Sequence, residues 1–162
     1  MSALLKNLSE YNVSEIPDAS EFSFAIVVAD YNSDITYPML RGCIETLLAH
    51  GADEQFILVQ HVPGAFELPI AAQVLIENNE LNAVICLGCV ITGETKHDEY
   101  ISNAVANGLM KLGLDFSVPV IFGVLTPQTL EQAQARAGGK HGNKGVEAAI
   151  SAIKMAQLLL EE

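Results

Sequence analysis

Short apolar runs that alternate with helical patterns constrain the fold of this chain more than any other feature. Four runs are almost continuously apolar, as is typical of strands buried on both faces of a parallel sheet: residues 22–29, 56–59, 83–90 and 118–125. Five further segments read as helices: residues 36–50, 66–78, 98–112, 127–137 and 146–160. Strands that alternate with helices predict an α/β fold, in which helices cover both faces of a four-stranded parallel sheet.

Glycine and proline residues mark the ends of several predicted elements. Gly51 follows the first helical pattern and predicts its C-terminus. Pro69 is tolerated in the next helix because it lies in the first turn. Pro119 indicates the start of the last strand or an edge of the sheet. The glycine-rich residues 138–145 predict a break between the last two helices, and a plain turn is the simplest interpretation.

The first 21 residues are predicted to form an arm outside the main domain. They are mostly polar, and residues 11–16, which alternate and end at Pro17, predict either an edge strand or a loose arm. No linker divides residues 22–162, so we expect a single domain there. The N-terminus lacks the long apolar core of a signal peptide, and no apolar run is long enough to span a bilayer. These features favour a cytoplasmic protein without a membrane partner.

The charge of the chain disfavours a nucleic-acid partner. Its 162 residues carry a formal net charge of −12, and such a surface repels phosphate backbones. An anionic ligand must therefore bind in a local positive pocket that works against this field.

Cys86 and Cys89 have the spacing of some redox and metal motifs, which usually occupy turns or helix starts. Here both lie in a predicted strand, where an odd separation directs two side chains to opposite faces. We therefore interpret them as core residues. An odd number of cysteines without an export signal makes a disulfide framework unexpected. The four histidines show no metal-ligand spacing with the cysteines, so no metal site is expected.

Polar and conformationally special residues follow each predicted strand. Tyr31 and Asn32 follow the first strand, residues 64–67 the second, residues 93–97 the third and Thr126 the fourth. In open parallel sheets, ligands bind beyond the carboxyl ends of the strands. We therefore expect these residues, although distant in sequence, to share one edge of the sheet and to form one site.

Residues 93–97, with the sequence Gly-Glu-Thr-Lys-His, predict an anion site beside an acid–base group. They lead from an apolar strand into a helix, whose free N–H groups and dipole favour an anion. His97 adds a group that transfers protons at neutral pH. This combination indicates a phosphorylated small molecule that undergoes acid–base chemistry. The alternatives are an ordinary helix cap for Thr95 and an ordinary exposed histidine.

Other polar residues have both a functional and a structural interpretation. Glu67 is either a hydrogen-bond acceptor for a polyol or amine, or a carboxylate that complements a helix dipole. Tyr31 is either a stacking platform or a packing residue, and Asn32 is also explained as a turn former. Arg136 suits a phosphate contact but also fits a helix C-terminus. Lys144, three residues before a glutamate, also fits a helix-surface pair.

Five segments, in this order, resemble the lumazine synthase family of riboflavin biosynthesis. They are DYN (30–32), VPGAFELP (62–69), GCVITGETKHDEY (88–100), PVIFGVLT (119–126) and the ends of RAGGKHGNKG (136–145). The resemblance extends from about residue 22 to the end of the chain and implies a three-layer flavodoxin-like fold. Members condense 5-amino-6-(D-ribitylamino)pyrimidine-2,4-dione with 3,4-dihydroxy-2-butanone 4-phosphate. The products are 6,7-dimethyl-8-ribityllumazine, phosphate and water, and no cofactor is used.

The resemblance implies a role for each matched position. Contacts to the pyrimidine or ribityl group are implied for Tyr31, Asn32, Ala65, Phe66, Glu67, Cys89, Val90, Ile91, Phe122, Lys144 and Glu147. Phosphate contacts are implied for Gly93, Glu94, Thr95 and Arg136, and proton transfer for His97. Two positions depart from the family. Thr92 stands where a basic residue is common, which weakens the local positive field, and Tyr31 stands where Phe or Trp is usual.

The resemblance also predicts an assembly. Members form pentamers, and some pack twelve pentamers into an icosahedral shell of sixty subunits. Each site lies between neighbours, with Phe122 and residues 136–144 facing the His97 side of the adjacent subunit. Residues 11–16 are expected to add a strand to a neighbour's sheet. The short connection between Arg136 and Lys144 favours the shell, and a riboflavin synthase partner inside it is left open.

Two alternative functions follow from the same residues. A flavodoxin-like electron carrier would bind flavin phosphate after the first strand, but residues 29–33 lack the required hydroxyl- and glycine-rich loop. A non-catalytic shell protein that binds lumazine or flavin is disfavoured by the presence of His97, Arg136 and Lys144.

Overall fold

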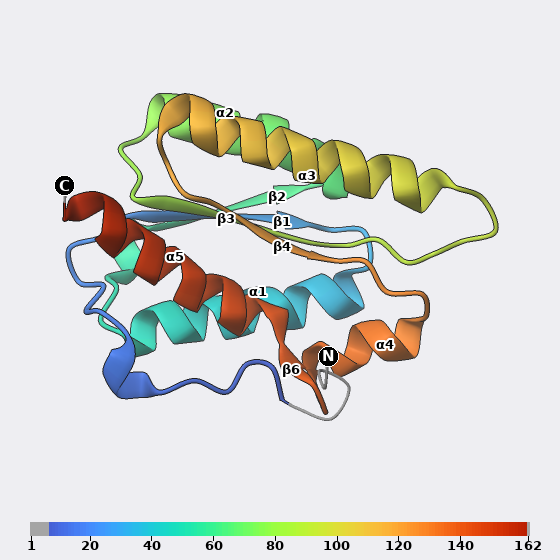
Figure 1. Cartoon of the computed structure of the whole chain (residues 1–162), viewed down its shortest axis with the longest axis horizontal. Coiled ribbons are helices and arrows are strands. Elements are labelled where there is room, and N and C mark those ends of the chain that lie inside the picture. The colour runs from blue at the N-terminus through green and yellow to red at the C-terminus, as the bar shows by residue number, and fades with distance from the viewer. Residues whose placement is uncertain (1–6, 162) are drawn as a thin grey trace.

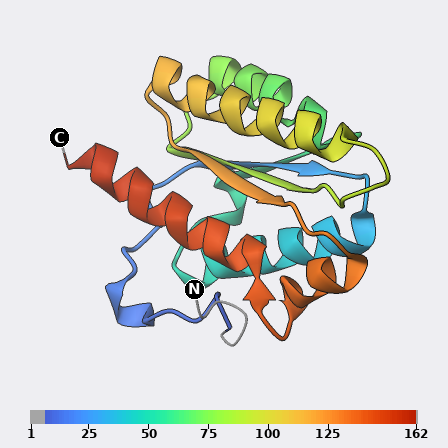
Figure 2. The same ribbon diagram turned by 45° about the vertical axis from the view of Figure 1, so that its right-hand side comes forward.

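The computed structural model describes residues 7–161 and has three layers (Figure 1). Four parallel strands form the central sheet in the order β2-β1-β3-β4: β1 (Phe24–Ala29), β2 (Ile57–Val62), β3 (Ala83–Cys89) and β4 (Val120–Leu125). One face is covered by α2 (Leu68–Asn78) and α3 (His97–Phe116). The other face is covered by α1 (Ser33–Ala49) and α5 (Lys144–Leu160), as the turned view in Figure 2 also shows. The predicted flavodoxin-like α/β fold is confirmed.

The burial of each strand follows from its place in the sheet. β1 and β3 are central and buried along their whole length, which explains their continuously apolar sequences. β2 is an edge strand with mostly exposed residues, so it tolerates the polar residues Gln60 and His61. The strand ends at Val62, three residues beyond its predicted end. Ala29 at the end of β1 pairs with Val62 at the end of β2, so the carboxyl ends of these strands are aligned.

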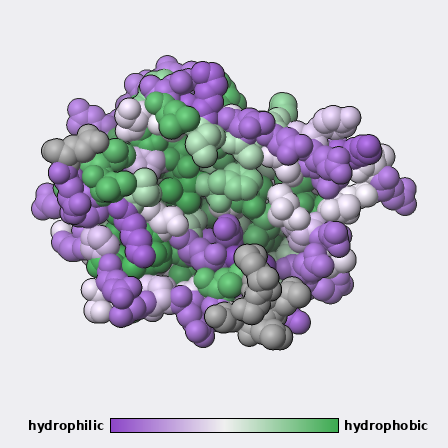
Figure 3. Space-filling model, in the orientation of Figure 1, coloured by the Kyte–Doolittle hydropathy of each residue, from purple (hydrophilic) through white to green (hydrophobic). Residues whose placement is uncertain are grey.

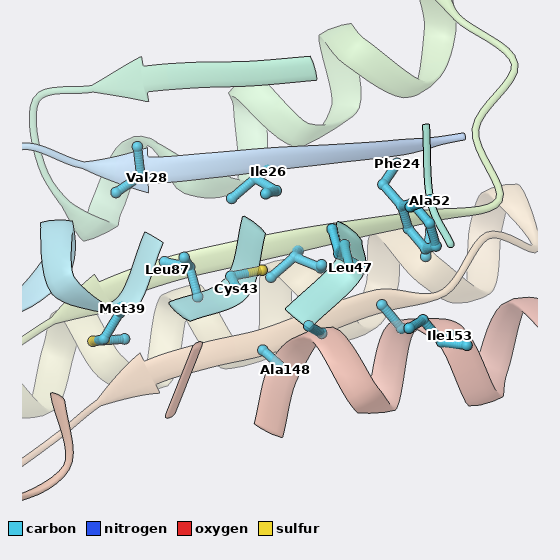
Figure 4. Packing of buried hydrophobic residues seen from close by; sticks show 14 of the residues in the cluster. Phe24, Ile26, Val28, Met39, Cys43, Leu47, Ala52, Leu87, Ala148 and Ile153 are labelled. Atoms are coloured by element: carbon cyan, nitrogen blue, oxygen red, sulfur yellow. The ribbon is translucent and has the colours of Figure 1, made fainter. Parts of the chain in front are cut away.

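The side chains of β1 alternate between two apolar clusters on opposite faces of the sheet. Phe24, Ile26 and Val28 belong to the cluster that includes Leu47 of α1 and Ile153 of α5 (Figure 4). The residues between them pack in the cluster under α2 and α3. Full burial of a side chain such as Ile26 stabilises the fold by roughly 1.5–3 kcal/mol.

The two cysteines of β3 are core residues on opposite faces, as predicted. Cys86 belongs to the cluster under α2 and α3, and Cys89 to the cluster under α1 and α5. Both are free and buried, as is Cys43. Burial raises the pKa of Cys86 to about 12 and the pKa of Cys89 to about 11, so both thiols stay protonated at neutral pH.

Two helices are longer than their sequence patterns predict. α1 begins three residues early, at Ser33, directly after Asn32, whose left-handed conformation with φ of 62° marks the boundary. It ends as predicted before Gly51, whose φ is 97°. α3 continues to Phe116, four residues beyond the predicted end.

The glycine-rich segment forms a hairpin, so the predicted plain turn is wrong. α4 (Leu130–Ala135) ends two residues before the predicted helix end, and β5 (Ala137–Gly139) pairs antiparallel with β6 (Gly142–Asn143). Gly138 and Gly142 have φ values of 101° and 90°, a region that glycine adopts without steric cost. These conformations let the chain reverse within a few residues and form a pair of short strands.

The start of α5 is fixed against α1. A Cβ atom at Gly145 would overlap the carbonyl oxygen of Met39 and would lie 2.7 Å from its carbonyl carbon. The side chain of Asn143 accepts a hydrogen bond from the N–H of Gly145 (2.8 Å) and donates one to the carbonyl oxygen of Pro38 (3.0 Å). The hairpin and the first turn of α5 are therefore anchored to α1.

Residues 7–21 form an irregular arm with no strand. Within residues 11–16 there is a single 3-10 turn, η2 (Val13–Glu15), which agrees with the loose arm and not with the edge strand. The arm is attached to the hairpin, because the N–H of Leu8 donates to the carbonyl oxygen of His141 (3.1 Å). Addition of this segment to a neighbour's sheet stays a prediction. None of the helices within residues 7–161 is long and apolar enough to cross a bilayer.

Candidate functional site

An open pocket of about 910 Å³ lies at the carboxyl edge of the sheet. Small-molecule sites typically measure about 300–1,000 Å³, so this pocket has room for a large ligand or for two small ones. Its walls are the loops after β1, β2 and β3 and the first turns of α3. It brings together the predicted site residues Tyr31, Asn32, Ala65, Phe66, Glu67, Cys89, Val90, Ile91, Gly93, Thr95 and His97.

The loop after β1 presents an aromatic ring between two anchored residues. Tyr31 is 73% exposed, so the packing interpretation does not fit and its ring is accessible to a ligand. The side-chain amide of Asn32 donates a hydrogen bond to the carbonyl oxygen of Cys89 (2.9 Å). Asn32 is therefore more than a turn former, because it ties the loop after β1 to the end of β3.

Asp30, on the other side of Tyr31, is held by two further elements. Its Oδ1 accepts hydrogen bonds from Nδ1 of His61 in β2 (2.7 Å) and from the hydroxyl of Tyr37 in α1 (2.8 Å). The bond from His61, followed by the bond from Tyr37, holds the pKa of Asp30 below its usual value. The bond to Asp30 in turn raises the pKa of Tyr37.

The loop after β2 supplies a second wall. Residues 65–67 form a 3-10 turn, η4 (Ala65–Glu67), directly before α2. Phe66 is exposed and Glu67 is partly buried. Glu67 stands at the N-cap of α2, but its side chain makes no capping hydrogen bond. Its carboxylate therefore keeps its lone pairs for a ligand.

The loop between β3 and α3 has free backbone amides. Within residues 7–161, the N–H groups of Gly93, Glu94 and Thr95 donate no hydrogen bond to another protein group. α3 begins at His97, whose N–H lies 3.4 Å from Oγ1 of Thr95, so the cap is weak. Free amides before a helix N-terminus attract anions. Glu94 itself does not line the pocket.

The pocket has no cation of its own. Among the described residues that line it there is no Lys or Arg, whereas Glu67 and Asp98 carry carboxylates. In a chain with a net charge of −12, backbone amides alone leave a bound phosphate short of positive charge. Cationic side chains from elsewhere are needed to complete an anion site here.

Five predicted site residues lie outside this pocket in the single chain: Glu94, Phe122, Arg136, Lys144 and Glu147. Arg136 donates to the carbonyl oxygen of His141 (2.7 Å) and to Glu147 (2.5 Å), and Nζ of Lys144 lies 3.9 Å from Glu147. A guanidinium has five N–H donors, so these two bonds leave donors of Arg136 for a ligand. Two cations share one carboxylate, and the cluster therefore keeps an excess positive charge.

The pocket also includes residues that were not predicted from the sequence: Pro63, Asp98, Tyr100 and Ile101. The last three lie one, three and four positions after His97 in α3. Residues at this spacing share one side of a helix, so the position of His97 already contained the signal.

Comparison with known proteins identifies the family. Residues 21–160 match the family model described as 6,7-dimethyl-8-ribityllumazine synthase. Similar curated proteins with that name come from Porphyromonas gingivalis (50% identity, covering 98% of both chains), Cytophaga hutchinsonii (54%, 96% of this chain and 97% of the relative) and Parabacteroides distasonis (48%, 96% and 97%). The chain therefore belongs to the 6,7-dimethyl-8-ribityllumazine synthase family.

Proposed function

We propose that this chain condenses 5-amino-6-(D-ribitylamino)pyrimidine-2,4-dione with 3,4-dihydroxy-2-butanone 4-phosphate to give 6,7-dimethyl-8-ribityllumazine, phosphate and water, the penultimate step of riboflavin biosynthesis. The main support is the pocket, which combines an exposed aromatic ring, free backbone amides and a histidine. The chain that forms it belongs to this family. An amine adds to a carbonyl, water and phosphate leave, and a ring closes. Holding two substrates together is the main requirement of such a reaction.

The pyrimidinedione is proposed to bind against Tyr31. This exposed ring suits stacking on a flat heterocycle. One amide hydrogen of Asn32 is donated to Cys89, so its side-chain oxygen and second amide hydrogen remain for the ribityl chain. The carboxylate of Glu67 is also free to accept hydrogen bonds from the ribityl hydroxyls. The N–H of Val90 is bonded to Leu125, so the amide of Ile91 is the donor left to read the ring edge.

The butanone phosphate is proposed to bind at the loop before α3. The free amides of Gly93, Glu94 and Thr95 suit its phosphate, and His97 at the first position of the helix suits proton transfer to and from the reacting atoms. Arg136 is proposed to stabilise the charge that develops on the departing phosphate. Because the lining of the pocket within residues 7–161 includes neither Arg136 nor another Lys or Arg, we propose that another copy of the chain supplies Arg136.

We propose a site shared between neighbouring subunits of a pentamer, with Phe122, Arg136, Lys144 and Glu147 of one subunit covering the pocket of the next. The face in Figure 3 supports this, because hydrophobic residues gather over β4 and α3 and are surrounded by hydrophilic ones. Exposed apolar side chains of this region include Phe122, Met110 and Leu114. Patches of this kind mark interfaces. The short connection between Arg136 and Lys144 favours packing of pentamers into a shell.

The activity is tested by mixing both substrates with the protein and recording the fluorescence of the lumazine product. Positioned acid–base groups contribute roughly 10²–10⁴-fold, and we expect His97→Ala to lower kcat by about 10²-fold, at the lower end of this range. His50→Ala is the matched control. His50 lies at the C-terminal end of α1, whereas Tyr31 and Asn32 of the pocket precede its N-terminal end, so this variant should keep wild-type kcat. An unchanged kcat in His97→Ala at saturation with both substrates would refute the role of the histidine.

The shared site is tested by complementation. His97→Ala and Arg136→Ala subunits are each expected to be nearly inactive alone. When they are co-expressed, about one quarter of the head-to-tail interfaces combine an intact His97 with an intact Arg136, so about a quarter of the activity should return. Sedimentation of the wild type distinguishes a pentamer from a shell. No recovery in mixed assemblies would place both groups in the same subunit.

A further inference from the structure

We propose that Asp30 is a positioning residue for the pyrimidinedione, held by His61 and Tyr37 so that the loop after β1 presents Tyr31 in one orientation. The inference rests on the proposed function, in which Tyr31 is the platform for the pyrimidine ring. It assigns a role to three side chains outside the predicted site.

The three side chains come from three elements that meet at the carboxyl edge of the sheet. Asp30 directly follows β1, His61 lies near the end of β2, and Tyr37 lies in the second turn of α1. The hydrogen bonds from His61 and Tyr37 converge on the same oxygen of Asp30, at 2.7 and 2.8 Å. The rings of the two donors also meet edge to face, with centroids 5.6 Å apart and an angle of 87°. The carboxylate is therefore fixed from two directions.

Backbone hydrogen bonds extend this anchor to Tyr31. The N–H of Asp30 donates to the carbonyl oxygen of Val62 (2.8 Å), and the N–H of Tyr31 donates to the carbonyl oxygen of Pro63 (2.9 Å). The loop after β1 thus runs beside the loop after β2, and both line the pocket. On the other side of Tyr31, Asn32 is bonded to the end of β3. Tyr31 therefore stands between two side-chain anchors.

The exposure of the network indicates a local role. The side chains of His61 and Asp30 are 46% and 47% exposed, and exposed ion pairs contribute little to global stability. A network of this kind acts mainly on the segment that it restrains. A ligand that stacks on a pre-ordered ring does not have to order the loop when it binds. The entropic cost of binding is therefore smaller, and the affinity is higher.

The test is the steady-state kinetics of Asp30→Ala with each substrate varied in turn. We expect KM for the pyrimidinedione to rise about tenfold, the scale of lost hydrogen bonds to a charged group. Within residues 7–161, the hydrogen bonds of Asp30 go to His61, Tyr37 and Val62 and not to residues 93–97, so kcat and KM for the butanone phosphate should stay within about twofold of wild type. Calorimetric binding of the pyrimidinedione should weaken by the same factor as its KM rises.

Conservative variants separate positioning from a general structural role. Asn at position 61 places its Nδ2 near the position of Nδ1 of histidine, so His61→Asn should keep the affinity that His61→Ala loses. Asp30→Asn still accepts hydrogen bonds and should recover most of the affinity lost in Asp30→Ala. Asp115→Ala is the matched control, because this exposed aspartate pairs with Lys111 at the far end of α3.

Two outcomes would overturn the proposal. One is an unchanged KM and unchanged calorimetric affinity for the pyrimidinedione in Asp30→Ala. The other is a parallel loss of all kinetic parameters together with a fall in Tm, which would make Asp30 a structural residue. A wild-type protein that forms no lumazine would refute the proposed function instead, and the calorimetric comparison then still decides whether Asp30 orders a binding site for the pyrimidinedione.

Discussion

The contact between α1 and α5 predicts that Gly145→Ala strongly destabilises this protein. The added Cβ would overlap the carbonyl oxygen of Met39 and would lie 2.7 Å from the carbonyl carbon, with Oδ1 of Asn143 at 3.0 Å. The atoms of Met39 in this contact belong to the backbone of α1, so no side-chain rotation relieves the overlap. The two helices must separate, and the apolar cluster between them must loosen.

The magnitude follows from the cost of overpacking. Extra methyl groups in well-packed interiors cost about 1–3 kcal/mol, and a collision with backbone belongs at the upper end, so we expect a loss of about 3 kcal/mol. For a chain of this length each kcal/mol lowers Tm by about 2–4 °C, which gives a fall of about 6–12 °C. Lys144 and Glu147 flank the substituted residue, so activity should fall as well.

Urea unfolding followed by far-ultraviolet circular dichroism measures this effect, with m-values compared to check that the denatured state is unchanged. Gly108→Ala in α3 is the matched control, because its Cβ meets only the ring of Pro69, at 3.2 and 3.3 Å. A gain in helix propensity of about 1 kcal/mol offsets this mild crowding, so the control should stay near wild type. A loss below about 1 kcal/mol in Gly145→Ala would refute the reasoning.

Two further predictions concern ionisable groups. The hydroxyl of Tyr37 donates a hydrogen bond to the ionised Asp30, and this bond raises the pKa of Tyr37. The stability that the pair contributes is therefore complete at neutral pH and is lost as the pH rises through the raised pKa of Tyr37. Asp30→Asn should move the pKa of Tyr37 down, as measured by ultraviolet titration of each protein against its Tyr37→Phe variant, and an unmoved midpoint would contradict the assignment. Burial raises the pKa of Cys86 to about 12 and that of Cys89 to about 11, so both thiols should react with a disulfide reagent at neutral pH only after unfolding. Rapid labelling of the native protein would show that β3 is less protected than its burial indicates.

The sequence predicted the fold well where one physical signal dominated. β1 and β3 are covered on both faces, so their sequences are continuous apolar runs of a kind that loops and exposed edge strands rarely contain. β2 was predicted too short because its C-terminal half contains the exposed polar residues Gln60 and His61, which are typical of a loop. The hairpin of residues 137–143 was predicted as a turn because glycine spacing does not reveal which carbonyl and amide groups pair.

The candidate site was predictable in outline because the ends of parallel strands converge. The rule that ligands bind beyond these ends places Tyr31, Glu67 and His97 in one pocket, and the structure brings them together. The network around Asp30 was not predictable in this way. Its members lie in a loop, a helix and an edge strand, and their contact depends on the register between β1 and β2 and on the direction of α1.

The two faces of the sheet are completed at different stages of synthesis. α2 and α3 follow β2 and β3 along the chain and pack on one face, so both helices of that face have been synthesised once residue 116 has left the ribosome. The opposite face is covered by α1 and α5, and α1, which also packs against β1 and β3, lacks its contact with α5 until that helix is translated. Until α5 emerges, a nascent chain therefore exposes the apolar residues of α1 and of the sheet that α5 will cover, and such transiently exposed surface is prone to aggregation.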